Sequence, residues 1–571
     1  MFKNQPAGLY VLSLANMGER FGYYTMLAIF LLFLQAKFGF DAAVSGQIYA
    51  IFLALVYFMP LIGGWVADKW SFSKCVVTGI CIMFVGYLIM AIPTEIRSTS
   101  SLVVLCAALA LIAVGTGLFK GNLQVMVGDL YNDPRYSSQR DSAFSIFYMA
   151  INIGSMYAPM TATAMCNMAM KGQGLVYNQK LPALCNAYLD GHENAADLVA
   201  TINESGMQVG TSLGDFCMKY IDTLSTGYGY GFGVACVSLI VSFLVYIIGR
   251  RAYAQVITDK KSASAASAVN NGPELTPSQT KSRIIALLLV FAVVIFFWMV
   301  FHQNGATLTE FAKSCTSPEA TGWTRIGFNV WALTAIFIGV YALFNLFQTR
   351  SNSGRAISAL ILAAVAGALV YIYNITPEVV EGIQPQQYQQ FNPFYVVALT
   401  PVSLALFGWL ASRKKEPSAP RKIGYGMVMA GIAYGVMVIG SLGLAGTQGA
   451  VSPNWLISTY LLLTFAELLL SPMGISFVSK VAPPKYKGAM MGGWFAATAI
   501  GNYLVSIPML LWGKISLAWL WGILIIICGI SATFIFAIMK KLEAATSDAP
   551  ALDPVDNVED LSLIHISEPT R

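Results

Sequence analysis

Charge is scarce in this chain: only 11% of its 571 residues are Asp, Glu, Lys or Arg, whereas 56% are hydrophobic. Soluble domains carry about 25% charged residues, so a large globular core in water is excluded. The nine cysteines lack CxxC and Cys/His metal spacing, which argues against a zinc site. The chain also has no GxxxxGKS/T phosphate loop and no nucleophile–base spacing, so neither an ATP-driven pump nor an enzyme is expected.

Apolar runs of about 20 residues are abundant instead, and each is long enough to cross a bilayer as a helix. The predicted spans lie near residues 8–37, 46–67, 74–93, 102–130, 142–165, 229–249, 284–310, 324–347, 355–374, 391–412, 423–446, 454–479, 488–513 and 517–539. Lys and Arg clusters such as Arg250 with Arg251 follow alternate spans, which places both termini on the cytoplasmic side. The sequence therefore predicts an all-α integral membrane protein of about fourteen spans, N-in/C-in, with the lipid bilayer and not nucleic acid as its partner.

Three segments are too polar to be spans. Residues 166–228 predict an extracytoplasmic insertion, and residues 252–283 predict a flexible cytoplasmic linker between two helical bundles. Residues 541–571 predict a disordered tail, whose last stretch SLIHISEPTR resembles translated adaptor sequence. Four cysteines are expected on the outer side, Cys166, Cys185, Cys217 and Cys315. Whether one or two disulfides form among them is a question that the sequence leaves open.

Charged side chains nevertheless occur inside the apolar runs, namely Glu19, Arg20, Lys120 and Glu467, together with one histidine, His302. A charge at the bilayer centre costs roughly 3 kcal/mol on insertion scales, so each of these residues needs a partner and a reason. Structural ion pairs between helices are one explanation. A polar cavity that handles a charged solute is the interpretation we favour, because the charges are spread over several spans.

The first span carries a polar stripe, in which Asn16, Glu19, Arg20, Tyr23 and Tyr24 recur at spacings of three and four residues. Adjacent residues on a helix diverge by about 100°, so Arg20 is expected to find a carboxylate on another helix. Lysines in buried positions, such as the one in GTGLFKGN, can anchor an anion.

Further polar residues mark other spans. Tyr148 and Asn152, four residues apart, are typical of helix-packing pairs. Glu467 is followed by Pro472, and a helix broken there would expose polar backbone. The loop GGWVADKWSFSK offers glycines for close packing (Gly63 and Gly64) and an acid, Asp68, that can pair across an inner gate.

These stretches resemble the proton-dependent oligopeptide transporter family, a branch of the major facilitator superfamily. The first-span NMGERFGYY is similar to that family's ExxERFxYY. GTGLFKGN, FSIFYMAINIGS, FNPFYVVALTPV, AELLLSPMG and MMGGWFAATAIGNY match other family segments in the expected order, over residues 8–540 apart from the loops. The resemblance implies a major facilitator fold of two six-helix bundles plus two extra helices, in a bacterial inner membrane. It also implies import of di- and tripeptides with protons by alternating access.

The resemblance also implies which residues act. Arg20 and Lys120 would hold the peptide carboxylate, while Asn152, Asn392 and Glu467 would hold its amine. The other implied contacts are Tyr24 and Tyr57 to the peptide backbone, Trp494 in a side-chain pocket and Asp68 at the gate. A zwitterion of fixed length is well recognised by a cationic pole and an anionic pole on opposing bundles.

Two departures from the family pattern affect proton coupling. Asn16 stands where the family usually has its first glutamate, and His302 stands where many members carry an acid. We therefore hypothesise that Glu19 and His302 share the proton work, since histidine titrates near neutral pH. The position of the extra helix pair also differs. In this chain the pair follows the seventh core helix, whereas many bacterial members place it between the two bundles.

The predicted organisation is, in chain order, helices 1–5 of the N-terminal bundle (1–165), the insertion (166–228), the sixth helix (229–251), the linker (252–283), the seventh core helix with an outer loop (284–323), the extra helix pair (324–374), the rest of the C-terminal bundle (375–540) and the tail (541–571). We expect a monomer with no cofactor other than the coupling proton. Two alternatives stay open: transport of another small anion or peptide-like compound on the same fold, and an uncoupled facilitator or receptor. A carboxylate such as Glu467 would repel a simple anion, which argues against the first alternative.

Overall fold

The computed structural model describes residues 5–547, except residues 134, 137–138, 193–194, 211, 255–275, 445, 448 and 484–485. The described chain is almost entirely helical, as the sequence predicts. Thirteen of its helices are long and apolar enough to cross a membrane. Helix α5 is not among the thirteen, although it has 33 residues and packs against two of them, α1 and α8.

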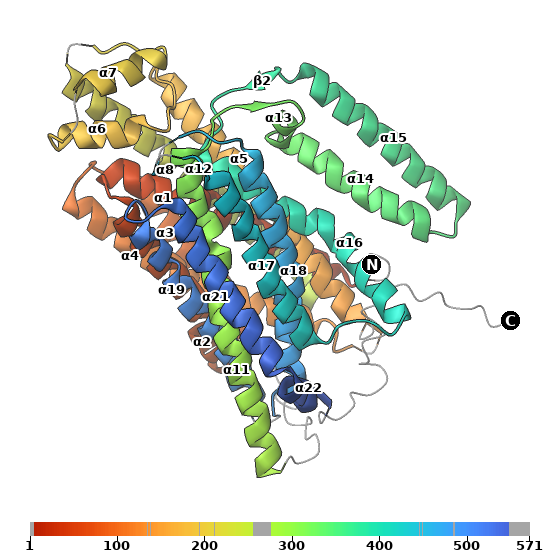
Figure 1. Ribbon diagram of the computed structural model, residues 1–571. Helices are drawn as coiled ribbons and strands as arrows, with labels where there is room; N and C mark the ends of the chain where they lie inside the picture. Colours follow the sequence, from red (N-terminus) through yellow and green to blue (C-terminus); the bar gives the residue numbers. More distant parts are fainter. Residues whose placement is uncertain are drawn as a thin grey trace.

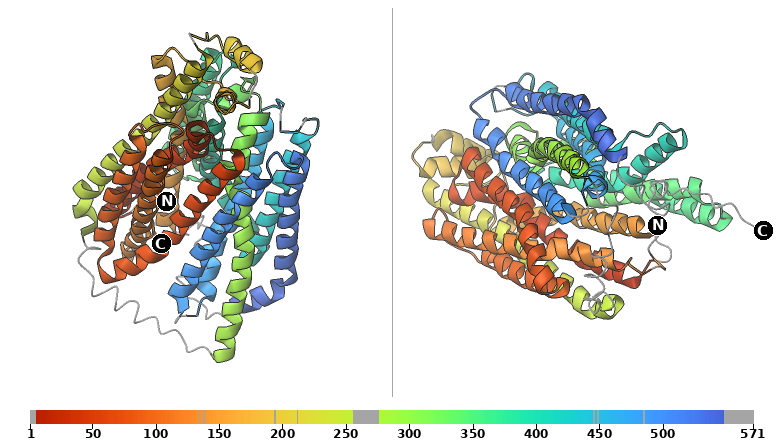
Figure 2. Two further views of the ribbon diagram at one scale, coloured as in Figure 1. Left: turned by 90° about the vertical axis from the view of Figure 1, so that its left-hand side faces the viewer. Right: turned by 90° about the horizontal axis from the view of Figure 1, so that it is seen from below.

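Six long helices form the N-terminal bundle, in red to yellow in Figures 1 and 2. They are α1 (Ala7–Phe38), α2 (Ala42–Lys69), α3 (Phe72–Ala91), α4 (Thr99–Asp129), α5 (Arg140–Gly172) and α8 (Leu213–Ile248), the last continued by η2 (Gly249–Tyr253). Two short helices, α6 (Leu181–Leu189) and α7 (Ala195–Glu204), lie between α5 and α8 at the end of the molecule that we call the outer end. The predicted boundaries 166–228 are too wide, because α5 continues to Gly172 and α8 begins at Leu213.

The C-terminal bundle is built from α11 (Pro277–Phe301), α16 (Phe391–Ser412), α17 (Ala419–Ser441), α18 (Asn454–Val481), α19 (Lys487–Leu504) and α21 (Leu517–Ala537). Its shorter segments are η3 (His302–Gly305) and α12 (Thr307–Cys315) after α11, α20 (Ser506–Leu511) after α19, and α22 (Met539–Ser547). The linker and the tail are both shorter than predicted. Pro277 starts α11 under a Thr276–Gln279 capping box, and α22 extends into the predicted tail. Residues 255–275 and 548–571 lie outside the described part.

The extra helix pair consists of α14 (Val330–Gln348) and α15 (Asn352–Ile375). It is flanked by α13 (Thr324–Gly327) and η4 (Pro385–Gln390), and by strands β1 (Ala320–Thr321) and β2 (Val379–Val380), which pair antiparallel. Helix α14 packs against α16, while α15 packs mainly against α14 and stays largely exposed. Figure 1 shows the pair projecting from the bundles, so it is peripheral to their interface.

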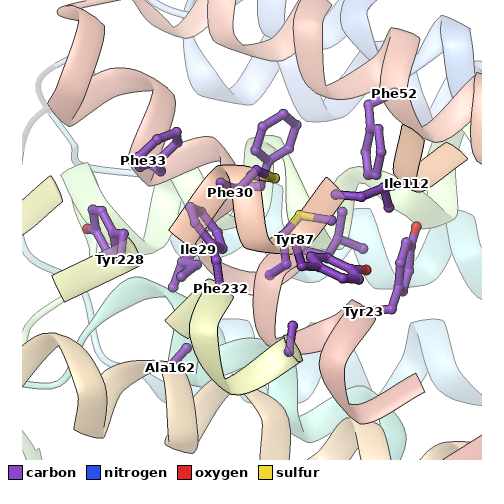
Figure 3. Packing of buried hydrophobic residues seen from close by; sticks show 14 of the residues in the cluster. Tyr23, Ile29, Phe30, Phe33, Phe52, Tyr87, Ile112, Ala162, Tyr228 and Phe232 are labelled. Atoms are coloured by element: carbon purple, nitrogen blue, oxygen red, sulfur yellow. The ribbon is translucent and has the colours of Figure 1, made fainter. Parts of the chain in front are cut away.

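Buried apolar side chains form two clusters, essentially one per bundle. In the N-terminal cluster, Phe33 packs edge-on against Phe232 with ring centroids 5.1 Å apart (Figure 3). Helices α2 and α4 meet through glycine, since a Cβ on Gly63 would lie 2.1 Å from the Gly117 carbonyl oxygen. Gly64 faces open space, so close packing was predicted correctly for Gly63 alone.

Hydrogen bonds join the two bundles at the outer end. Gln35 of α1 donates to Glu310 of α12 at 2.7 Å, and Lys313 donates to Gln35 at 2.6 Å. Glutamines in and beside η4 make three more such hydrogen bonds. Gln384 donates to Asn167 at 2.7 Å, Gln386 donates to Thr163 at 3.1 Å, and Gln389 donates to the Ala28 carbonyl at 3.2 Å. These hydrogen bonds therefore hold the two bundles together at the outer end.

Candidate substrate site between the bundles

Two charged residues in the middle of α1, Glu19 and Arg20, pair with each other. Arg20 Nη2 donates to Glu19 Oε1 at 2.5 Å, and Nε donates to Oε2, so the salt bridge is bidentate. Both residues are buried, with 3% and 1% of their surface exposed. The prediction that Arg20 needs a carboxylate on another helix is wrong. Both side chains are long enough to bend toward each other, and an unpaired charge in this apolar setting is costly.

Lys120 of α4 supplies a second cation close by. Its Nζ lies 4.0 Å from the ring centroid of Tyr57, a cation–π contact from α2. It also interacts electrostatically with Arg20 and Glu19. Within the described part of the chain, no carboxylate lies within salt-bridge distance of Lys120. This lysine is thus the cation of the site that a ligand carboxylate can neutralise.

Glu467 of α18 is the matching carboxylate on the opposite bundle. It accepts hydrogen bonds from Tyr148 Oη of α5 at 2.9 Å and from Asn392 Nδ2 of α16 at 3.1 Å. Asn392 is itself held by Thr464 Oγ1 at 2.9 Å. Among the described residues no cation pairs with Glu467. Its negative charge is therefore available to a ligand cation, although its position is fixed by neutral donors.

Two tyrosines connect these opposite charges. Tyr24 of α1 and Tyr57 of α2 each interact electrostatically with both Arg20 and Glu467. Contacts across the bundles support the same placement, since Glu467 is hydrogen-bonded to Tyr148 of the N-terminal bundle and the Tyr57 ring lies 5.8 Å from that of His302. The cations of the N-terminal bundle and Glu467 therefore face the same interface between the bundles. The arrangement is a dipolar site, with its positive side on one bundle and its negative side on the other.

His302 lies at the edge of this region, where the seventh core helix is interrupted. Helix α11 ends at Phe301, and the histidine opens η3 before α12 begins. Its Nδ1 is 2.5 Å from Asn502 Oδ1 of α19, and its ring stacks on Trp298 at 5.0 Å. The Tyr57 ring lies 5.8 Å away. With the Asn502 amide in this orientation its oxygen accepts the hydrogen of Nδ1, and Nε2 is then the nitrogen that can exchange a proton.

Other implied site residues are placed less directly. Asn152 donates to the backbone carbonyl of Tyr148 at 2.9 Å and makes no hydrogen bond to Glu467. Trp494 lies in the core of the C-terminal bundle against Phe291. Asp68 lies at the end of α2, and its side chain is outside the described part of the chain.

Two further features differ from expectation. Helix α18 continues through Pro472, so the interrupted helix is the one that holds His302 and not the one that holds Glu467. Asn16, which replaces the family's usual glutamate, is 3% exposed, and its Nδ2 has no hydrogen-bond partner among the described residues.

Sequence reasoning missed Tyr148 and Asn502 as site residues. Tyr148 was noted only as half of a helix-packing pair, and its i, i+4 relation to Asn152 gives no hint of a partner on α18. Asn502 occurs in the matched segment MMGGWFAATAIGNY, so that motif was the available signal.

A cavity of about 300 Å³ opens at the outer end, away from these charges. Its lining includes Asp41, Tyr177, Asp190 and Lys313. Lys313 is already paired with Glu310 at 2.7 Å, so the cavity does not present a free cation. The candidate site is therefore the dipolar region between the bundles and not this cavity.

Known proteins resemble the chain over most of its length. A sequence profile described as the POT family matches residues 73–272 and 360–519. The chain is 29% identical to the uncharacterised transporter YclF of Bacillus subtilis, covering 87% of this chain and 86% of that protein. It is 27% identical to a di-/tripeptide transporter of Lactococcus lactis, covering 87% of each.

A solved structure agrees with this similarity at the level of the fold. The crystal structure of a mutant of a POT peptide transporter in complex with sulfate superposes with a TM-score of 0.65 and 22% identity. The match covers 95% of this chain and 96% of that one. The arrangement of two helical bundles is thus shared along nearly the whole chain.

Proposed function

Because the chain belongs to the POT family, we propose that it imports di- and tripeptides together with protons by alternating access. The observation that carries this proposal is the dipolar site, with Lys120 and the Arg20–Glu19 pair on one bundle and Glu467 on the other. The chain is a multi-pass protein of the inner membrane, so such a site lies where a solute must pass.

Peptide recognition follows from charge complementarity. Lys120, which has no carboxylate partner in the described chain, would bind the peptide carboxylate with help from Arg20. Glu467 would bind the ammonium group, because Tyr148 and Asn392 fix its oxygens without neutralising its charge. A ligand that bridges the two bundles stabilises the closed arrangement, which is what alternating access requires of a substrate.

The other contacts implied by the family motif remain part of the proposal. Tyr24 and Tyr57 would contact the peptide backbone, since each interacts electrostatically with both charged poles. Asn152 and Trp494 would act through the residues they support, Tyr148 and the wall of the C-terminal bundle. Asp68 would act at the inner gate.

Proton coupling is assigned to Glu19 and His302. A proton on Glu19 would neutralise the carboxylate that now occupies Arg20, so that Arg20 becomes free for the peptide carboxylate. Protonation of His302 would add a positive charge beside Lys120 and Tyr57. Both events change the charge of the site, so they couple proton binding to substrate binding.

The deciding experiment is uptake of radiolabelled dialanine into liposomes that contain the purified protein. We expect accumulation above equilibrium when the interior is more alkaline than the exterior, and no accumulation when the proton gradient is collapsed by an ionophore. Equal uptake in both conditions would favour an uncoupled facilitator. Competition by nitrate or phosphate and not by di- and tripeptides would favour an anion transporter instead.

Replacing His302 by glutamine is expected to abolish most gradient-driven accumulation while exchange of dialanine at equal pH continues. Glutamine retains a hydrogen-bonding side chain but cannot take up a proton, so coupling should fail before binding does. Both rates are measured in the same liposomes. The matched control is His192→Gln, a change at an exposed histidine of the outer insertion. Unchanged accumulation in His302→Gln would remove His302 from the mechanism.

A further inference from the structure

The outer insertion is fastened onto the N-terminal bundle at two places. Asn186 of α6 donates through Nδ2 to the Ala36 carbonyl at 3.0 Å, which caps the end of α1. Arg97, between α3 and α4, forms an ion pair with Asp190 and donates to Asn186 Oδ1 at 3.2 Å. Helix α6 also packs against α8. The insertion is thus a docked cap of this bundle (Figure 1).

Two cysteines meet where α6 packs on α8. Cys185 of α6 is directly beside Asn186 in sequence, and Cys217 lies near the start of α8. Both are completely buried free thiols on the two packed helices, close enough to interact with each other. The other two cysteines of the outer side are differently placed. Cys166 lies on α5, and Cys315 Sγ donates to the Thr447 carbonyl at 3.2 Å.

The pair lies outside the hydrocarbon layer. Helix α8 has 36 residues and is about 54 Å long, whereas the hydrocarbon core of a bilayer is about 30 Å thick. Cys217 is in the second turn of this helix, at the end that carries the insertion. The positive-inside pattern of the loops places this end in the extracytoplasmic compartment, where thiols are exposed to oxidants.

We propose that Cys185 and Cys217 form a disulfide that fastens the outer insertion to α8. Each thiol loses one hydrogen as the S–S bond forms. The two electrons and two protons pass to the disulfide of an extracytoplasmic thiol oxidase, which is reduced to a dithiol. The reaction precedes full burial, while the insertion is still folding onto the bundle. The bond closes the chain between residues 185 and 217, which keeps Asn186 in register on the end of α1.

Mass spectrometry of the native protein tests the proposal directly. Cells are quenched with acid, free thiols are blocked with N-ethylmaleimide under denaturing conditions, and the protein is digested with trypsin without reductant. The chain has no Lys or Arg between Lys180 and Lys219, so both cysteines fall in the single peptide 181–219. We expect this peptide without maleimide and lighter by two hydrogen atoms than its reduced form. Cys166 and Cys315 serve as internal controls and should carry the label.

A peptide 181–219 that carries maleimide on both cysteines would overturn the proposal. A second measurement tests the structural consequence on the unmutated protein, since replacing a buried thiol can itself impair folding. Treatment with a phosphine reductant should lower the melting temperature by about 3 °C or more. In Cys185→Ser the reductant should have no such effect, whereas in the control Cys315→Ser the decrease should persist. An equal decrease in Cys185→Ser would contradict the assignment to this pair.

Discussion

Replacing Glu467 by glutamine should lower the initial rate of gradient-driven dialanine uptake by about 30-fold or more. The amide still bonds to Tyr148 and Asn392, so the site keeps its shape while it loses the charge that faces the ammonium group. Removing one partner of a buried hydrogen-bonded charge pair costs about 2 to 5 kcal/mol, and about 2 kcal/mol corresponds to that factor. Initial rates in liposomes at several dialanine concentrations measure the effect.

Competition by a ligand without an ammonium group distinguishes a loss of amine recognition from general damage to the protein. In the unmutated protein, N-acetyl-dialanine should compete with labelled dialanine far less well than dialanine itself. In Glu467→Gln the two competitors should become nearly equal, because the residue that distinguishes them is neutral. The matched control is Glu378→Gln, a change at an exposed acid of the outer loop, which should behave like the unmutated protein. Retention of more than half of the uptake rate in Glu467→Gln would contradict the assigned amine contact.

Replacing Lys120 by glutamine should have an effect of similar size at the other end of the peptide. Its ammonium group contacts Tyr57 and has no salt bridge in the described chain, so its removal leaves no carboxylate unpaired. Arg20 is a poorer target, because its removal would leave Glu19 buried and unpaired. We expect a loss of about 30-fold in uptake rate, from the same arithmetic for a charge-assisted contact.

The diagnostic ligand in this case is alanyl-alaninamide, which has no carboxylate. It should compete poorly in the unmutated protein and about as well as dialanine in Lys120→Gln. Lys120→Arg keeps the charge and should retain part of the uptake, while the exposed Lys171→Gln should be neutral. If dialanine and its amide are still distinguished in Lys120→Gln, then Arg20 alone selects the carboxylate.

Much of the fold is predictable because lipid constrains sequence strongly. Every backbone polar group in hydrocarbon must be paired, so an apolar run of about 20 residues has to be a helix. The spans read from the sequence correspond to α1–α5, α8, α11, α14–α19 and α21, although their ends differ by up to sixteen residues at α8. The helix ends were predicted wrongly because helices extend beyond the hydrocarbon layer, and hydropathy does not reveal the polar turns that lie outside it. The N-in/C-in orientation rests on the loop charges and stays a prediction.

The site was predictable in part for a related reason. A charge inside an apolar span is energetically costly, so the sequence alone indicates that Arg20, Lys120 and Glu467 have a role. The residues that contact them cannot be predicted from the sequence, because these contacts join residues that are far apart along the chain. Tyr148 and Glu467 are on different bundles, as are Tyr57 and His302.

The sequence by itself thus determined the helical class, the order of the long helices, the family motifs and the residues whose charge needs explaining. Only the tertiary structure decided that Arg20 pairs with Glu19, that Asn502 holds His302 at a helix break, and that Cys185 meets Cys217. The physical reason is that hydropathy and charge are properties of a residue type, summed along the chain. The choice of partner depends on side-chain reach and on which helix faces are brought together, and these are fixed only when the bundles pack.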